Sequence, residues 1–316
     1  MDKVYYDVLD QAIKRRGYSR KTYDAYAMWM RRYLLYLSPR SLEQSTRQDV
    51  ERYLTHLAVD REVAAATQNQ ALSALLFIFQ HVVSRPVGFL SGIERAKPTD
   101  HLPTTLSATE LTMLFEKLEG TELLVAQLLY GAGLRVGEAV SLRIQDIDIS
   151  KAQLEIRDAK GKRDRITFLP KRVAPQLSQA MQRAKRCFAA DLQSNTRVSL
   201  PHAFERKSPN AAKEWRWRWL FPAKTTRADS QYSRVREHMH ASGIQRAIRR
   251  AANEADITRR VTCHTLRHSF ATDLVERGVD IKTVARLMGH KDIRTTQIYV
   301  HTCLRKRGGL TSPLDW

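Results

Sequence analysis

Cysteine is scarce in this sequence. Its 316 residues include three, Cys187, Cys263 and Cys303, and no two of them are spaced as a CxxC pair. We therefore expect no structural zinc site, because such sites are built from closely spaced cysteines and histidines. A sparse, odd number of cysteines also suits reduced thiols, which favours a cytosolic protein.

Long apolar runs are also missing. The most apolar stretches, residues 71–79 and 123–130, are too short to span a bilayer. The amino-terminal residues lack the apolar core of a signal peptide. These absences predict a cytoplasmic protein that has no membrane partner.

Acidic residues are outnumbered by basic ones. The chain has 53 Lys and Arg against 33 Asp and Glu, which gives a net charge of +20. A surplus of this size indicates a polyanionic partner, with nucleic acid as the first candidate, although a generic basic surface is the plainer alternative. At 316 residues the chain is long enough for about two domains.

What the sequence does contain at its start is helical periodicity. Apolar residues recur every three or four positions over residues 23–37, which predicts a helix with Ser19 as its N-cap. Thr46 and Asp49 resemble a capping box for a second helix, and a third carries the apolar residues of 71–82. We expect a helical domain here.

Basic side chains flank the first two of these helices. Arg20, Lys21 and Arg31 are among them, and they could grip DNA phosphates by displacing counterions. The alternative is an ordinary charged face in contact with solvent. For any single one of these residues the sequence leaves both interpretations open.

The composition divides the chain into two domains. After the helical residues 1–90, prolines and glycines break the pattern over residues 91–105, which we interpret as a linker. A capping box formed by Ser107 and Glu110 then opens a helix. We expect the second domain to span residues 106–316, with an insertion near residues 194–222.

The second domain has mixed periodicity. Polar and apolar residues alternate over residues 153–158 and 164–169, which predicts a β-hairpin. Gly278 stands where a glycine would end a helix. The fold class that we expect is mainly α with a small β-sheet. The helices expected in this domain are residues 122–142, 173–193, 243–256, 265–277, 280–288 and 292–300.

Three of the five tryptophans alternate with arginines over residues 215–219. A period of two predicts a strand that has one aromatic face and one cationic face. Such a strand could stack on unpaired bases while it holds phosphate. The alternative, which the spacing alone favours, buries the tryptophans in the core and leaves the arginines in solvent.

Six polar residues supply what is needed to cut and rejoin a DNA strand without a metal. His264 and Arg267 are three residues apart, so on a helix they share a face and can donate several hydrogen bonds to a phosphate. Glycines surround Arg135 and would allow sharp turns, and Glu138 is well placed to orient an arginine. The six residues are Arg135, Lys160, His264, Arg267, His290 and Tyr299.

Each of these residues also has a plainer explanation. Arg135 could form a salt bridge at a helix end, and His290 could cap a helix. His264 and His268 could bind a metal at i and i+4 spacing, although no HExxH pattern surrounds them. Tyr299 could be half-buried core. Each plain explanation is favoured singly, but the complete set favours phosphate chemistry.

The motifs around these residues resemble those of tyrosine recombinases, the phage-integrase family. The likeness covers nearly the whole chain and implies a helical core-binding domain, a mixed α+β catalytic domain, no cofactor, and a homo-tetramer on DNA. Residues 302–316 would then pack onto a neighbouring protomer. The resembling segments are Gly133–Glu138, the hairpin around Lys160, His264–Thr272, Leu287–His290 and Tyr299.

This resemblance also implies a mechanism. Tyr299 attacks a phosphodiester and forms a 3′-phosphotyrosyl intermediate, so neither ATP nor a metal is needed. His264 is the candidate general base, and Lys160 is the candidate general acid for the 5′ hydroxyl that leaves. The two arginines and His290 stabilise the charge of the transition state. We expect the activity to survive a chelator.

A narrower resemblance concerns the insertion and the end of the chain. Residues 200–207, 215–222 and 311–316 are similar to segments of integron integrases. In that family the insertion helps to bind a folded single-stranded cassette site through its extrahelical bases. The resemblance implies DNA contacts by Trp215, Trp217, Trp219, His238 and His240, with Trp219 as the first candidate.

Three alternatives stay open at this point. The chain could be a phage integrase or a chromosome-dimer recombinase that acts on duplex sites. It could be a non-catalytic DNA-binding regulator, although a regulator has no use for a placed phenol. It could also be a metal-dependent nuclease that uses His264 and His268.

Overall fold

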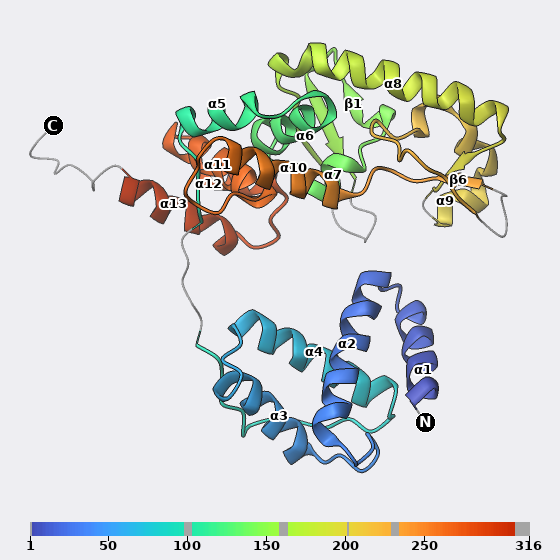
Figure 1. The fold of residues 1–316 in the computed structure, drawn as a ribbon, viewed down its shortest axis with the longest axis vertical. Helices are drawn as coiled ribbons and strands as arrows, with labels where there is room; N and C mark the ends of the chain where they lie inside the picture. Colours follow the sequence, from blue (N-terminus) through green and yellow to red (C-terminus); the bar gives the residue numbers. More distant parts are fainter. Residues whose placement is uncertain (1, 98–102, 158–163, 201, 229–233, 307–316) are drawn as a thin grey trace, which may run out of the picture. The chain divides into compact units, whose positions relative to one another are not determined.

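The chain divides into two compact units, Met1–His101 (unit 1) and Leu102–Trp316 (unit 2). The structure, a computed structural model, describes residues 2–97, 103–157, 164–200, 202–228 and 234–306. Helices dominate both units (Figure 1), which confirms the expected fold class. None of the helices in the described part is long and apolar enough to cross a membrane.

Unit 1 is a helical unit with a single apolar core, in which Trp29, Tyr33 and Phe79 are among the largest fully buried side chains. Ser19 accepts a hydrogen bond at the start of the second helix, and Thr46 forms a capping box at the start of the third, as predicted. The first helix adds to the three that the periodicity predicted. The helices are α1 (Asp2–Arg15), α2 (Arg20–Leu37), α3 (Arg47–Val59) and α4 (Ala65–His81).

The first part of the predicted linker is attached to unit 1. Glu51 of α3 accepts hydrogen bonds from the backbone N–H groups of Ser91 at 3.0 Å and Gly92 at 3.2 Å. The Gln68 side chain of α4 donates to the carbonyl of Glu94 at 2.7 Å. Residues 91–97 form no helix or strand. The hydrogen bonds to Glu51 and Gln68 nevertheless attach this segment to unit 1.

Unit 2 is organised around α6, which packs against α5, α7, α8, α10 and α11. Helix α6 is apolar nearly all round, and such helices are buried in the centre of a domain. The Ser107 capping box and the helix end at Gly278 (φ +84°) are confirmed. The helices are α5 (Ala108–Glu116), α6 (Gly120–Gly131), α7 (Val136–Val140), α8 (Ala174–Gln193), α9 (His202–Lys207), α10 (Ala241–Glu254), α11 (Cys263–Glu276), α12 (Ile281–Met288) and α13 (Arg294–Lys306).

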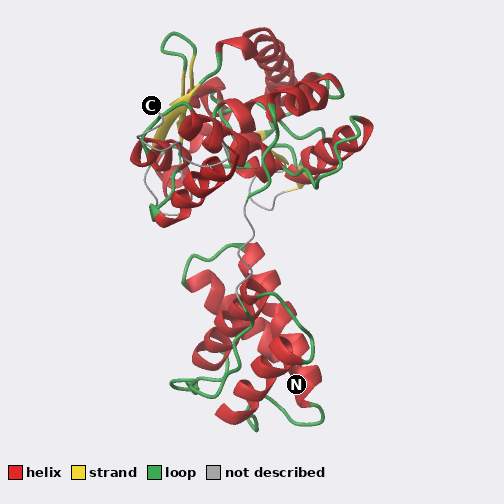
Figure 2. Ribbon diagram, turned by 90° about the vertical axis from the view of Figure 1, so that its left-hand side faces the viewer, coloured by secondary structure: helices red, strands yellow, loops and turns green. Residues whose placement is uncertain are grey.

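Two small sheets lie among these helices, as short strands in Figure 2. The predicted hairpin is confirmed: β2 (Gln153–Ile156) and β3 (Arg165–Phe168) pair antiparallel, and β1 (Ile147–Asp148) extends the sheet along β2. The second sheet was not predicted, because its strands are two or three residues long. It has the order β4-β6-β5 and comprises β4 (Arg197–Val198), β5 (Arg227–Ala228) and β6 (Arg234–Arg236).

The strand predicted for residues 215–219 is wrong. Trp215–Trp217 forms a 3₁₀ turn, whose three residues per turn do not separate alternating residues onto two faces. Trp217 and Trp219 are buried, but so is Arg218, which is 3% exposed. The Arg143 guanidinium lies 3.7 Å from the ring centre of Trp219 and 5.4 Å from that of Trp217. The segment is thus a packed part of unit 2.

Candidate active site

Five of the six residues that carry the expected chemistry come together in unit 2. Arg267 Nη2 lies 3.4 Å from His290 Nε2, and the rings of His290 and Tyr299 stack with centroids 6.4 Å apart. Arg135 reaches the same place, where it donates to the carbonyl of Gly289 at 3.4 Å. The sixth, Lys160, lies outside the described residues. The five stand on the start of α7, on α11, just after α12 and on α13.

The centre of this arrangement is the carboxylate of Glu138. It accepts a hydrogen bond from Arg135 Nη1 at 2.8 Å and two from Arg165, from Nη1 at 3.0 Å and from Nη2 at 2.7 Å. Arg267 Nη1 forms an ion pair with the same carboxylate at 3.6 Å. Burial raises the pKa of Glu138, but Arg165 and then Arg135 more than offset this and bring it to about 2. Three guanidiniums share one carboxylate, which leaves two surplus positive charges for an anion. We call these four residues the Glu138 cluster.

Two glycines allow the arginines to approach so closely. Gly133 has a φ of +64°, and a Cβ there would meet the Phe270 ring at 2.4 Å. Its carbonyl accepts a hydrogen bond from Arg267. Gly289 ends α12 in the left-handed region, and a Cβ there would meet the Arg165 guanidinium at 2.9 Å. Larger residues at either position would displace a guanidinium or the ring behind it.

The site has an exposed layer and a buried layer. His264 is exposed, and the Arg135 side chain is 41% exposed, so both can meet a phosphate from solvent. Arg267 and Tyr299 are buried, at 3% and 2% exposure. A ligand that arrives from solvent can therefore reach Arg135 and His264, whereas protein covers the phenol of Tyr299.

The phenol of Tyr299 is paired with a histidine that the sequence did not single out for this role. His268 Nδ1 lies 2.9 Å from the Tyr299 hydroxyl. Burial, then the charges of His264 and Arg267, lower the pKa of His268 to about 4, so its ring is neutral at pH 7. Burial also raises the pKa of Tyr299, against an opposing effect of Arg267 and Arg135. The available signal in the sequence is the i, i+4 spacing from His264, which indicates a possible metal pair but not a contact with Tyr299.

His290 has a defined tautomer in this arrangement. Because Arg267 can only donate, His290 Nε2 accepts at 3.4 Å, and its Nδ1–H donates to Thr296 Oγ1 at 2.9 Å. Burial and then the charges of Arg267 and Arg135 lower the pKa of His290 to about 4. His290 thus connects α11 to α13 and presents a neutral ring to the face of Tyr299.

The metal alternative depends on His264 and His268, whose ring centroids are 6.2 Å apart. Within the described parts of the chain, no group of three or more His, Cys, Asp or Glu side chains is placed to hold a metal ion. A hydrolytic metal needs about three protein ligands. The two histidines alone do not supply such a site.

The residues predicted to touch extrahelical bases differ in their exposure. Trp217 and Trp219 are 9% and 7% exposed, so their ring faces are covered by protein, which counts against base stacking in this conformation. Trp215 is half-buried, with Lys185 Nζ 4.8 Å from its ring centre. His238 is also half-buried, with its Nδ1 2.8 Å from the Met239 carbonyl and its ring edge-on to Trp219. His240 is exposed and caps α10.

The basic residues predicted to grip DNA in unit 1 are exposed. Arg20 pairs with Asp10 and Asp24 and lies 4.2 Å from the ring centre of Tyr23. Lys21 and Arg31 are exposed on the same helix, α2. Phosphate binding by these three residues stays a prediction.

Comparisons with known proteins identify the family of this chain. The Phage integrase family matches residues 104–304, and the N-terminal SAM-like domain of phage integrases matches residues 5–88. An "Integrase/recombinase" of Escherichia coli and one of Pseudomonas aeruginosa are each 39% identical over 311 residues, 98% of this chain and 92% of theirs. A tyrosine recombinase of Thermosipho africanus is 28% identical over 312 residues, 95% of each chain.

Solved structures show the same fold. A XerH site-specific recombinase bound to a palindromic difH substrate has a TM-score of 0.64 at 19% identity, over 96% of this chain and 82% of that one. A lambda integrase dimer bound to a core site has a TM-score of 0.60 at 17% identity, over 93% of each chain. Since the family matches span most of both units, this chain belongs to the phage integrase family of tyrosine recombinases, DNA strand-transferring enzymes that carry out site-specific recombination.

Proposed function

We propose that Tyr299 is the nucleophile of two successive transesterifications that need neither a metal nor ATP. The observation that carries this proposal is the phenol held between His268 and His290 beside the Glu138 cluster. The phenol oxygen forms a bond to a DNA phosphorus, and the bond to the 5′ oxygen breaks. A 5′ hydroxyl of the partner strand then attacks the phosphotyrosyl bond and releases Tyr299, so the phosphodiester energy is kept.

The proton of the phenol passes to His268 in this proposal. A free tyrosine has a pKa near 10, so it needs a base in contact at neutral pH. His268 is neutral and lies 2.9 Å from the hydroxyl. His264, the base expected from the resemblance, is exposed and suits a hydrogen bond to the phosphate instead. Lys160 stays the proposed acid for the 5′ oxygen, and Arg135 and Arg267 stabilise the charge on phosphorus.

The nucleophile can be tested with a suicide substrate, a nicked site that traps the covalent intermediate. The Tyr299→Phe protein should bind the site but form no covalent adduct, because only the attacking oxygen is removed. Adduct formation by this variant would refute the assignment. The same assay in EDTA should give an unchanged yield, and complete loss on chelation would refute metal independence.

The proposed substrate pair includes one folded single-stranded site, as in integron integrases that join gene cassettes. Supporting this, residues 194–222 fold into α9, two 3₁₀ turns and a strand of the second sheet, a distinct part of unit 2. Trp215 and His240 are the surface candidates for contact with unpaired bases. Trp217 and Trp219 could join them only if the packing around Arg143 opened.

This specificity is measured by comparing two forms of one cassette site. Binding and cleavage of the folded bottom strand, with its unpaired bases, are set against the same sequence as a duplex. We expect tighter binding to the folded strand. Preference for the duplex would favour the alternative, a phage integrase or chromosome-dimer recombinase.

The proposed assembly is a homo-tetramer in the cytoplasm that holds two sites. It is supported by a lambda integrase tetramer bound to a Holliday junction, which shares the fold with a TM-score of 0.61 at 16% identity. The residues proposed to contact a neighbouring protomer, 302–316, fall mostly outside the described part of the chain. Light scattering of the protein on synthetic Holliday junctions should give four protomers per junction.

A further inference from the structure

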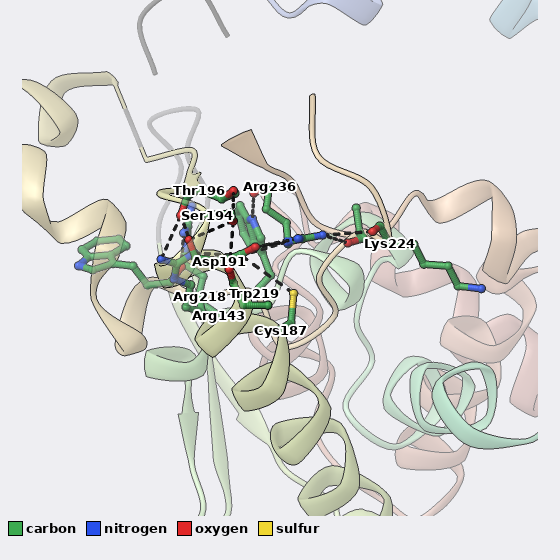
Figure 3. Close-up of polar contacts among 12 residues, drawn as sticks. Arg143, Cys187, Asp191, Ser194, Thr196, Arg218, Trp219, Lys224 and Arg236 are labelled. Atoms are coloured by element: carbon green, nitrogen blue, oxygen red, sulfur yellow. Dashed lines mark hydrogen bonds and ion pairs between the residues drawn. The ribbon is translucent and has the colours of Figure 1, made fainter. Parts of the chain in front are cut away.

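A second group of buried charges lies where α8 ends beside the second sheet (Figure 3). Asp191 is 1% exposed and accepts hydrogen bonds from Arg218 Nη1 at 3.2 Å and from Arg236 Nη2 at 2.7 Å. Trp219 joins this group through a hydrogen bond from its ring N–H to the Arg236 carbonyl. We call Asp191, Arg218 and Arg236 the Asp191 cluster.

This cluster has more positive charge than its carboxylate can neutralise. Two guanidiniums share one carboxylate, which leaves one surplus positive charge. Arg218 is 3% exposed, and its Nε is buried with no hydrogen-bond partner in the described structure. Burying a charge without full compensation is unfavourable, so a purely structural role would be served better by one arginine. The surplus would be offset by an anion close by.

An open cavity of about 470 Å³ adjoins the cluster on the side of Arg236. Its lining includes the cationic residues Lys224, Arg234 and Arg236 and the hydroxyl residues Thr196, Thr225 and Thr226. Thr196 belongs to both features, because its carbonyl accepts from Arg218 at 3.4 Å. Among the described lining residues there is no carboxylate and no aromatic side chain.

We propose that this cavity binds a backbone phosphodiester of the DNA site. Hydroxyl and guanidinium donors suit phosphate oxygens, whereas recognition of a base needs an aromatic or planar surface to stack on. The proposal rests on the DNA strand transfer proposed above and extends it to a second point of contact. Figure 1 shows α9 and β6 at the end of unit 2 opposite α13, so this phosphate is not the one that is cut.

A phosphate contact has a distinctive dependence on salt. Each neutralised phosphate releases counterions, so it contributes about 0.9 to the slope of log affinity against log salt on duplex DNA and about 0.7 on single strands. Such a contact weakens binding for any sequence, unlike a base contact. Losing it should therefore change affinity and slope together, on folded and duplex sites alike.

The test compares Arg234→Gln with wild-type full-length protein, by titrating folded and duplex site DNA at several NaCl concentrations. We expect about 3- to 10-fold weaker binding near 0.1 M salt and a slope less steep by about 0.7 to 0.9. Arg234→Lys should keep the slope. Arg250→Gln removes another exposed arginine of unit 2, which pairs with Glu122 and Glu254 and lies outside the cavity, and it should change neither quantity. An unchanged slope in Arg234→Gln, or an equal change in Arg250→Gln, would overturn the proposal.

Two further measurements keep the outcomes separate. Inorganic phosphate is titrated against chloride at equal ionic strength in a thermal melt. Stabilisation by phosphate that Arg234→Gln abolishes, together with an unchanged DNA slope, would assign the cavity to free phosphate and overturn the DNA assignment. Arg234→Gln should still form the Tyr299 adduct at saturating DNA. Absence of an adduct in the wild-type protein would instead count against the proposed chemistry.

Discussion

Two clusters in unit 2 use the same parts, arginines around one carboxylate, and differ in how much of the guanidinium reaches solvent. In the Glu138 cluster the exposed fractions of the arginine side chains are 41% for Arg135, 8% for Arg165 and 4% for Arg267. In the Asp191 cluster they are 4% for Arg218 and 13% for Arg236. In the Glu138 cluster the guanidinium of Arg135 is therefore accessible to a ligand. In the Asp191 cluster the surplus positive charge is accessible mainly at Arg236.

The difference shows that exposure, more than composition, separates a cluster that a ligand can reach directly from one that is largely enclosed. Arg135 is oriented by Glu138 and still free on one side, as transition-state stabilisation requires. Arg218 is enclosed: its guanidinium carbon lies 4.8 Å from the ring centre of Phe188, and its Nη1 lies 3.2 Å from Asp191 Oδ2. A ligand from solvent therefore does not reach its side chain directly. We expect changes in the first cluster to lower the reaction rate and changes in the second to lower stability.

The largest expected effect is on stability. Asp191→Asn removes the carboxylate from two largely buried guanidiniums, which should cost about 3–5 kcal/mol of unfolding free energy. Urea unfolding of the wild-type protein and the variant measures this difference in unfolding free energy. The double variant Asp191→Asn, Arg218→Met should recover part of the lost stability. An Asp191→Asn protein as stable as wild type would remove the distinction between the clusters.

The complementary change is Arg135→Gln in the Glu138 cluster. It should slow adduct formation about 100- to 1000-fold, the effect of losing one oxyanion donor. The melting temperature should change little, because the side chain is 41% exposed. Single-turnover cleavage of a suicide substrate gives the rate. A large loss of stability with an unchanged rate would reverse the roles assigned here.

A sharper comparison concerns His268, which contacts Tyr299 beside the Glu138 cluster. His268→Phe removes the acceptor of the Tyr299 proton and should slow adduct formation about 100-fold, the lower end for general base catalysis. His268→Asn can keep a hydrogen bond but has no basic nitrogen. If His268 only positions Tyr299, the His268→Asn variant should form the adduct at nearly the wild-type rate. If His268 takes the proton, the His268→Asn variant should be as slow as His268→Phe.

The smallest expected effect concerns pH. The pKa of His268 and that of His290 are lowered to about 4, whereas an unfolded histidine titrates near 6.5. Below pH 6.5 the unfolded chain takes up protons before the folded chain, so stability is lost as pH falls from about 6.5 to 4. We expect the melting temperature to drop by about 2–4 °C or more over this window. His268→Phe should lessen the drop, and an equal drop in that variant would contradict the burial of a neutral ring.

The candidate active site and the Asp191 cluster also differ in how far the sequence predicts them. Arg135, His264, Arg267, His290 and Tyr299 stand in recognisable local motifs, so their meeting could be expected before the fold was known. The role of Glu138 as a partner of Arg135 follows from its position three residues later, but its contacts with Arg165 and Arg267 do not follow from sequence spacing. The pairing of Tyr299 with His268 was missed, because i, i+4 spacing shows a shared helix face but not what lies opposite it.

The Asp191 cluster could not be predicted in this way. Asp191 lies 27 residues before Arg218 and 45 before Arg236, and none of the three stands in a motif. Alternation over residues 215–219 even placed Arg218 on a solvent face, because it suggested a strand where the chain makes a 3₁₀ turn. Strands of two or three residues are likewise too short to leave a periodic signal.

The burial of Tyr299 has a consequence for the safety of the cell's own chromosome. A protein with a net charge of +20 spends much of its time on unrelated DNA, held by sequence-independent attraction. Such encounters would bring phosphates to the exposed guanidinium of Arg135. If Tyr299 is the nucleophile, as proposed above, its phenol, in a residue that is 2% exposed, would be out of reach of these phosphates. Strand breakage would then require a complex in which α13 is rearranged, and this requirement would protect the host's DNA.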